Sequence, residues 1–204
     1  MNETQQEATK RVLGLALPTD PRWVNMAEMD LAEILTDHAY CEQKAAMSGI
    51  SLIQQYPERE RLVRELAPIV TEEWGHFRQV LAEIDKRGLK LGEQRKDLYV
   101  NGLLQFQKKG GSREDRLIEK LLVFALIEAR SCERFRLLSL HISEESLKKF
   151  YHTFMVSEAG HYKLFIDLAK EYGDEEKVMQ RWKEYLAYET EMLKTLEVRG
   201  DRMH

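Results

Sequence analysis

Cysteine is nearly absent from this chain, and proline and glycine are scarce. The 204 residues include 2 cysteines, 4 prolines and 11 glycines. Two cysteines without a spaced framework exclude a secreted scaffold held by disulfides and a cysteine-rich zinc site. Few prolines and glycines argue against a sheet-rich fold, which needs many tight turns. These shortages favour a cytoplasmic protein built from long helices.

Long apolar runs are also missing. No segment approaches the roughly 18 consecutive apolar residues of a membrane span, and residues 1–10 are polar, without the apolar stretch of a signal peptide. The formal net charge is −4, which gives no bulk attraction to nucleic acid. We therefore expect a soluble protein that needs a local basic patch for any polyanionic partner.

What is abundant is charge combined with apolar residues at helical spacing. Charged residues make up 32% of the chain and hydrophobic residues 43%. Caps and breaks in the apolar periodicity predict a single all-α domain over residues 1–204, with a short connecting helix at about 94–107. The predicted four-helix bundle has core helices at about 25–55, 58–87, 113–140 and 144–172, and an additional helix at about 174–197.

Acidic and imidazole side chains interrupt the apolar faces of the four core helices. Reading each helix at spacings of three and four residues places one glutamate in every core face. In two of the helices a histidine follows the glutamate by three residues and lies on the same face. The six residues are Glu42, Glu73, His76, Glu128, Glu158 and His161.

This set of side chains is typical of a metal site. Four buried carboxylates without compensation would be very costly, and divalent cations supply that compensation. Carboxylates combined with two imidazoles suit first-row metals, and this number of ligands predicts two ions. Iron is the leading candidate and manganese the second. Nearly equal separations divide Glu42 from Glu73 and Glu128 from Glu158, as two similar helical hairpins require.

Several neighbouring residues leave alternatives open. Glu133 also lies on an apolar line of its helix, so it competes with Glu128 as the third-helix ligand; the repeat spacing favours Glu128. Glu72 breaks the spacing and is expected to face outward or to support the ligands, and His38 is expected in the core or beside a ligand. A different class of protein, a metal-free helical interaction protein, would bury the same residues as hydrogen-bonded networks.

Four segments carry a family resemblance over nearly the whole chain. They are TDPRWV (19–24), DHAYCEQKAA (37–46), IEARSCERF (127–135) and SEAGHY (157–162). With them the chain resembles the ferritin-like diiron-carboxylate superfamily, and more narrowly the bacterial MiaE-type tRNA hydroxylases that act on 2-methylthio-isopentenyladenosine. The resemblance implies a ferritin-like bundle in which the six glutamates and histidines named above are the iron ligands.

The same resemblance implies an activity and its partners. It implies a dioxygen-dependent monooxygenase that hydroxylates the isopentenyl side chain of a modified adenosine in tRNA, with electrons from a reductase. The main rival is a ferroxidase or iron-storage protein of the same fold. Basic residues that could meet tRNA form three sequence clusters: Lys86, Arg87, Lys90; Lys108, Lys109, Arg113, Arg116; Lys148 and Lys149.

Overall fold

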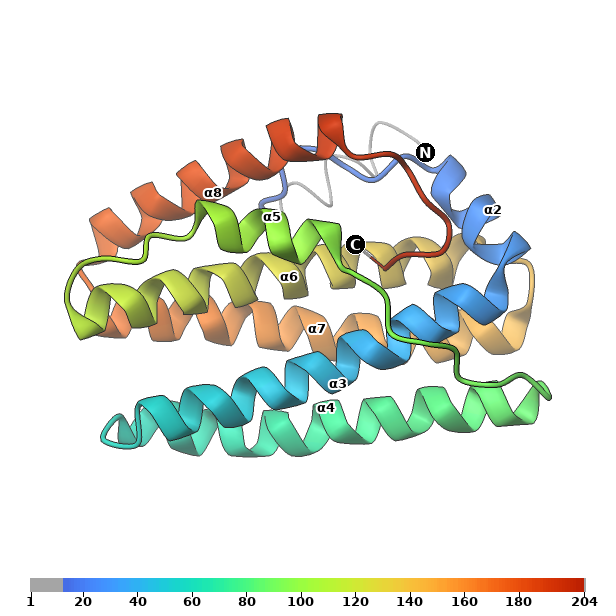
Figure 1. Ribbon diagram of the computed structural model, residues 1–204, viewed down its shortest axis with the longest axis horizontal. Coiled ribbons are helices and arrows are strands. Elements are labelled where there is room, and N and C mark those ends of the chain that lie inside the picture. Colours follow the sequence, from blue (N-terminus) through green and yellow to red (C-terminus); the bar gives the residue numbers. More distant parts are fainter. Residues whose placement is uncertain (1–12, 204) are drawn as a thin grey trace. The chain divides into compact units, whose positions relative to one another are not determined.

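The computed structural model describes residues 13–203, and within that range it contains helices and no strand (Figure 1). The all-α prediction is confirmed. The polar segment 1–10 lies outside the described residues. The helices are α2 (Arg22–Met29), α3 (Leu31–Gln55), α4 (Glu60–Lys86), α5 (Leu98–Phe106), α6 (Arg113–His141), α7 (Glu145–Tyr172) and α8 (Glu175–Thr195). None of the described helices is long and apolar enough to cross a bilayer.

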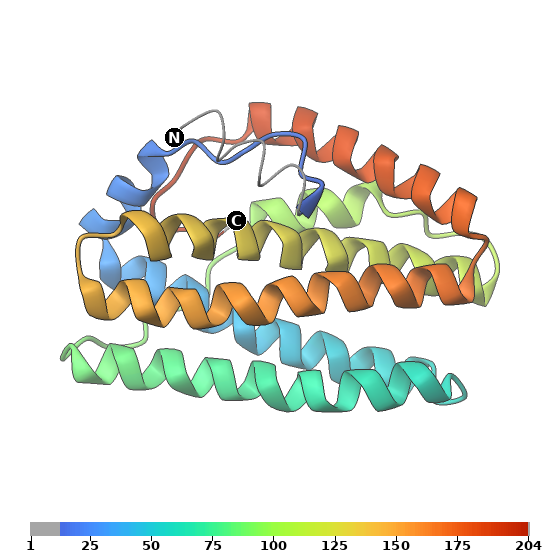
Figure 2. The ribbon, with the colours of Figure 1, turned by 180° about the vertical axis from the view of Figure 1, so that it is seen from behind.

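The helices form two compact units, each built on one long helical hairpin. The α3–α4 unit comprises residues 26–96 and 199–203, and the α6–α7 unit comprises residues 13–25 and 97–198. Within the second unit, α5 and α8 pack beside each other and against α6, as both ribbon views show (Figures 1 and 2). The two hairpins correspond to the repeat predicted from the sequence.

The predicted first core helix is divided. It breaks at Asp30, whose φ of −131° and ψ of 59° leave the helical region, so α2 ends at Met29 and α3 begins at Leu31. Buried apolar residues continue on both sides of the break, with Trp23 and Ala27 before it and Ile34 after it. Apolar periodicity therefore could not distinguish two consecutive helices from one.

Two predicted helix ends are confirmed by their capping bonds. The Ser112 hydroxyl accepts a hydrogen bond from the Asp115 backbone N–H, and the Asp115 carboxylate accepts one from the Ser112 N–H, which is a complete capping box for α6. At the end of α4, Gly88 has a φ of 65° and Leu89 N–H donates to the Ile84 carbonyl at 3.1 Å. These caps fix where the hairpin helices begin and end.

The C-terminal tail, residues 199–203, completes the α3–α4 unit. Met203 is fully buried, and its backbone N–H donates to Asp37 Oδ2 at 2.8 Å. Arg202 donates to the other oxygen of Asp37 at 3.1 Å, and Arg95 donates to Asp201 at 2.7 Å. The tail therefore holds α3 one residue before His38.

Candidate metal centre

The α3–α4 unit brings together three of the six predicted ligands. Glu42 on α3 and Glu73 and His76 on α4 are all buried, and their ligand atoms lie within 4.8 Å of one another. His76 Nδ1 is 3.3 Å from Glu42 Oε2 and 3.5 Å from Glu73 Oε2. These three residues occupy positions on the buried, mostly apolar faces of α3 and α4. Their polar side chains therefore point into the unit.

The α6–α7 unit repeats the arrangement with the other three. Glu128 on α6 and Glu158 and His161 on α7 are buried, and their ligand atoms also lie within 4.8 Å of one another. His161 Nδ1 is 3.5 Å from Glu158 Oε2, the same separation as between His76 and Glu73. Each unit thus holds one group of two glutamates and one histidine.

The donor set of each group fits a first-row transition metal. Nitrogen and oxygen ligands sit roughly 2.0–2.2 Å from such an ion, so two ligands of the same ion lie about 3 Å apart. The observed separations of 3.3 and 3.5 Å between imidazole and carboxylate atoms are close to that value. Other buried glutamates contact arginine instead: Glu119 meets Arg181 at 2.7 Å, and Glu133 meets Arg130 at 2.5 Å.

His38 contacts Glu42, one of the glutamates of the first group. It is completely buried, and its Nε2 lies 2.7 Å from Glu42 Oε1, one helical turn along α3. A donor on a ligand carboxylate fixes the direction of its lone pairs and the orientation of the group toward the ion. The sequence had placed His38 in the core or beside a ligand, and its position agrees with both descriptions.

We expect the substitution His38→Phe to lower the affinity for ferrous iron by about 10- to 100-fold, because Glu42 loses its orienting donor while the ring volume is kept. Titration of the metal-free protein with ferrous ions measures this. The control is Tyr40→Phe on the same helix, which removes only the bond from Tyr40 to the Gly92 carbonyl. Equal affinities in the two variants would contradict the role of His38.

The residues that competed for ligand roles have other contacts. Glu133 accepts hydrogen bonds from Thr19 N–H at 2.9 Å and from its hydroxyl at 2.6 Å, besides the contact with Arg130. Glu72 is exposed, with one oxygen 3.9 Å from His76 Nε2. Glu128 therefore remains our predicted ligand on α6, and Glu72 lies on the outer side of the histidine.

Cys132 is a buried thiol close to the second group. Its Sγ donates to the Met155 carbonyl at 3.3 Å. Burial, and then the carboxylates of Glu158 and Glu128, raise the pKa of the Cys132 thiol to about 12. The side chain is consequently protonated near neutral pH, which agrees with the prediction of a small buried residue.

Sequence reasoning missed a buried ionic network beside α6. Arg130 is almost fully buried and contacts Glu133 at 2.5 Å and Glu189 of α8 at 2.9 Å. Tyr99 of α5 donates to the same oxygen of Glu189 at 2.7 Å. An arginine at a buried position of a central helix was the available signal, because such a charge requires buried acidic partners.

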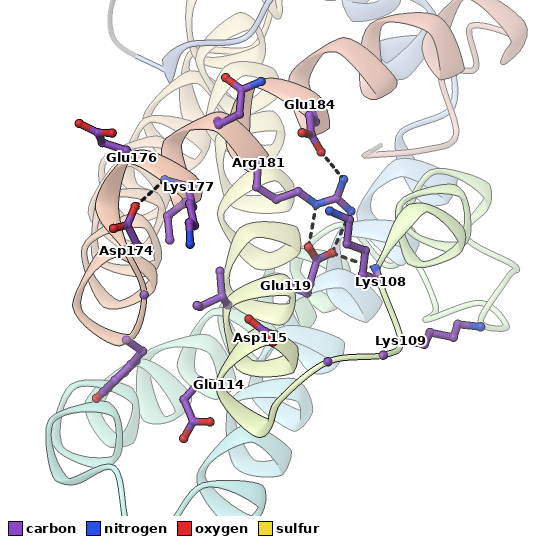
Figure 3. A pocket seen from close by; sticks show the side chains of 17 residues that line it. Lys108, Lys109, Glu114, Asp115, Glu119, Asp174, Glu176, Lys177, Arg181 and Glu184 are labelled. Atoms are coloured by element: carbon purple, nitrogen blue, oxygen red, sulfur yellow. Dashed lines mark hydrogen bonds and ion pairs between the residues drawn. The ribbon is translucent and has the colours of Figure 1, made fainter.

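A separate pocket of about 1310 Å³ lies in the α6–α7 unit (Figure 3). Arg181 lies at its wall, where it donates to Glu119 at 2.7 Å and to Glu184 at 2.8 Å. Lys108 and Lys109, one of the predicted basic clusters, line this pocket, but carboxylates outnumber cations along it. None of the six predicted ligands is among its lining residues, so it is separate from both ligand groups.

The fold and the two ligand groups define the class. An all-helical protein with buried glutamate and histidine groups compatible with iron belongs to the ferritin-like class. The family model described as tRNA-(MS[2]IO[6]A)-hydroxylase (MiaE) matches residues 6–204. The chain is a member of this MiaE family of tRNA hydroxylases.

Individual relatives agree with this membership. The chain is 39% identical over 161 residues to the tRNA 2-(methylsulfanyl)-N(6)-isopentenyladenosine(37) hydroxylase of Pseudomonas putida, covering 79% of this chain and 77% of that protein. The Salmonella typhimurium protein of the same name is 26% identical over an alignment of 211 residues, with the same shares covered. A solved structure, Protein 43 with aldehyde deformylating oxygenase activity from Synechococcus, is similar with a TM-score of 0.87 and 35% identity, covering 93% of this chain and 94% of that one.

Proposed function

We propose that this protein is a diiron monooxygenase that uses dioxygen to hydroxylate the isopentenyl side chain of 2-methylthio-isopentenyladenosine in tRNA. The match of the MiaE family over residues 6–204 is the observation that carries the proposal. The presence of a glutamate, glutamate and histidine group in each hairpin supports it, because the reaction needs a redox metal and both groups suit one.

We further propose that the two groups together bind two iron ions per chain, with manganese as the less favoured metal. Glu42, Glu73 and His76 would supply one half of the ligands, and the equivalent residues of the α6–α7 unit would supply the other. Bound iron would supply the activation of dioxygen and the oxidation of an allylic methyl C–H bond of the isopentenyl group. In the overall reaction one oxygen atom enters the alcohol and the other leaves as water, using two electrons and two protons.

The protein's own contribution is ligand orientation and exclusion of water. The bond between His38 and Glu42 holds one carboxylate in place. On α7, Tyr151 and Phe154 are fully buried and pack against Phe135 of α6, with ring centroids 5.9 and 5.5 Å apart. On α7 this aromatic wall begins two turns before Glu158 and ends one turn before it. It provides the dry surroundings that an apolar prenyl group and a reactive oxidant both require.

The reaction implies two partners and a location. The electrons would come from a separate reductase, because each turnover consumes two electrons beyond those that the oxidised side chain supplies. A tRNA substrate supports a cytoplasmic location for the enzyme. The ferroxidase alternative needs neither tRNA nor a reductase, and this difference separates the two functions experimentally.

The test uses the full chain expressed in iron-supplemented medium. We expect two irons per chain by elemental analysis. The reduced protein, given hypomodified tRNA and dioxygen, should yield the hydroxylated nucleoside in a nuclease digest examined by mass spectrometry. Rapid oxidation of added ferrous ions without nucleoside product would favour the ferroxidase. Consumption of an aldehyde instead would favour the activity named for the Synechococcus protein. A chain without metal would contradict the proposal.

A further inference from the structure

Between residues 146 and 166 the outer side of α7 carries lysines and no exposed carboxylate. Across residues 146–166, all of which the structure describes, the only acidic residue is Glu158, and that side chain is 2% exposed. The same stretch contains Lys148, Lys149 and Lys163. Although the whole chain has 35 acidic residues and a net charge of −4, the exposed side of this stretch carries positive charge and no carboxylate.

Helical spacing puts the exposed residues of this stretch on one line. Lys149, Val156 and Lys163 follow one another at intervals of two turns, and the two lysines are about 21 Å apart along the axis. His152, Thr153 and Gly160 flank this line and are also exposed. We call these six residues the α7 lysine face. It lies on the side of the helix opposite Glu158 and His161, which are both buried.

The two lysines of this face are available to a partner. Neither Lys149 nor Lys163 forms an ion pair with any described residue, whereas Lys148 is held by Glu145 at 2.5 Å. Glu145 lies before the face and Asp167 after it, so both ends are marked by carboxylates. The face therefore has a defined length, and neither of its lysines is held in an ion pair by a described residue.

Gly160 leaves open space in the middle of the face. A Cβ atom placed there would meet nothing within 4 Å, so packing inside the protein does not require the glycine. Glycine weakens a helix interior relative to alanine, and its benefit is the close approach of another molecule to the backbone. Gly75 holds the equivalent position in α4 and is equally open, so glycine alone does not distinguish the face. The α7 face differs in that Gly160 has no exposed carboxylate within one turn, whereas Glu72 is exposed one turn before Gly75.

We propose that the α7 lysine face is the surface on which the phosphate backbone of tRNA docks. The inference rests on the proposed function and specifies where its substrate is held. Unpaired lysines along an acid-free surface match the charge of a phosphate chain, and small polar residues between them allow close contact. A protein partner is less suited, because Val156, 59% exposed, is the one large apolar side chain of the face, and protein interfaces need an apolar centre.

Charge reversal tests this directly. The double substitution Lys149→Glu and Lys163→Glu is expected to raise the Kd for hypomodified tRNA at least tenfold. Two lost phosphate contacts should also reduce the slope of log K against log salt by about 1.4–1.8. The control reverses Lys183 and Lys194, two exposed lysines of α8, and so changes the net charge equally. The control should bind tRNA within about twofold of the unmodified protein.

Kinetics and a steric variant add independent readouts. The lysine double variant should show a raised KM and a kcat near the original value at saturating tRNA, because the ligand side of α7 is unchanged. Gly160→Gln should raise the Kd severalfold by filling the open space, whereas Gly75→Gln, its matched control in α4, should not.

The outcomes separate this inference from the proposed function. If the unmodified protein neither binds nor hydroxylates tRNA, both the docking surface and the proposed function are wrong. If it does both, and the lysine double variant binds tRNA with an unchanged Kd and salt slope, the docking surface alone is wrong. Unchanged tRNA binding with loss of reductase-supported turnover would assign the face to the reductase and would also overturn the inference.

Discussion

Glu73→Ala is expected to lower iron affinity by more than about 100-fold and to reduce turnover to background. Removal of a residue that merely supports a ligand already costs about 10- to 100-fold, so loss of a ligand itself should cost more. Glu73 is buried and its carboxylate lies 3.5 Å from His76 Nδ1, in the group that we assign to the metal. Elemental analysis and nucleoside formation measure the two effects.

The neighbouring residue provides a matched control for this experiment. Glu72→Ala removes the same side chain from the same helix at an exposed position, and should keep full metal content and activity. Without metal, Glu73→Ala should unfold at the same temperature as the original protein or higher, because one buried negative charge is gone. Full metal loading in the Glu73 variant would show that the ligand assignment in α4 is wrong.

Arg130→Met should destabilise the protein by about 3–5 kcal/mol, the usual cost of removing one partner from a buried ion pair. Glu133 and Glu189 would both lose the guanidinium that lies 2.5 and 2.9 Å from them. Urea unfolding at pH 7 measures the loss. Lys183→Met, an exposed charge deletion on α8, is the control and should change the free energy of unfolding by less than about 0.5 kcal/mol.

The loss of unfolding free energy in the Arg130→Met variant should depend on pH. Burial raises the pKa of the Glu189 carboxyl above its ordinary value, even with Arg130 beside it. A carboxyl whose pKa is higher in the folded state stabilises that state below its unfolded pKa, about 4.3, and loses this contribution as pH rises through the folded pKa. Without Arg130 the folded pKa is higher still. The deficit should therefore be smallest near pH 4–5 and grow toward pH 7.

The two groups of buried glutamates and histidines could be anticipated because each predicted ligand interrupts an otherwise apolar stripe. Glu42, Glu73 and His76 fall at spacings that packing dictates, so helical periodicity alone directs them inward. The Arg130 network was not predictable in this way, because its partners Glu189 and Tyr99 belong to other helices. Long-range ionic pairing leaves no periodic signal in a single sequence.

The α7 lysine face also could not be identified from clusters of basic residues in the sequence. Sequence clustering identified Lys149 beside Lys148 but passed over Lys163, which has no basic neighbour. Clustering also selected Lys108 and Lys109, which lie in a pocket where carboxylates outnumber cations. Helical geometry and exposure, which bring together residues two turns apart, decide which charges share a surface.

The contact between the C-terminal tail and α3 has a consequence for protein synthesis. Asp37 receives its hydrogen bonds from Arg202 and Met203, at sequence separations of 165 and 166. Because these two residues are synthesised after the whole α6–α7 hairpin and α8, the α3–α4 unit cannot acquire its complete set of contacts until that much of the chain has been made. A nascent chain stalled before residue 199 would carry Glu42, Glu73 and His76 on a hairpin that lacks the hydrogen bonds from Arg202 and Met203 to Asp37.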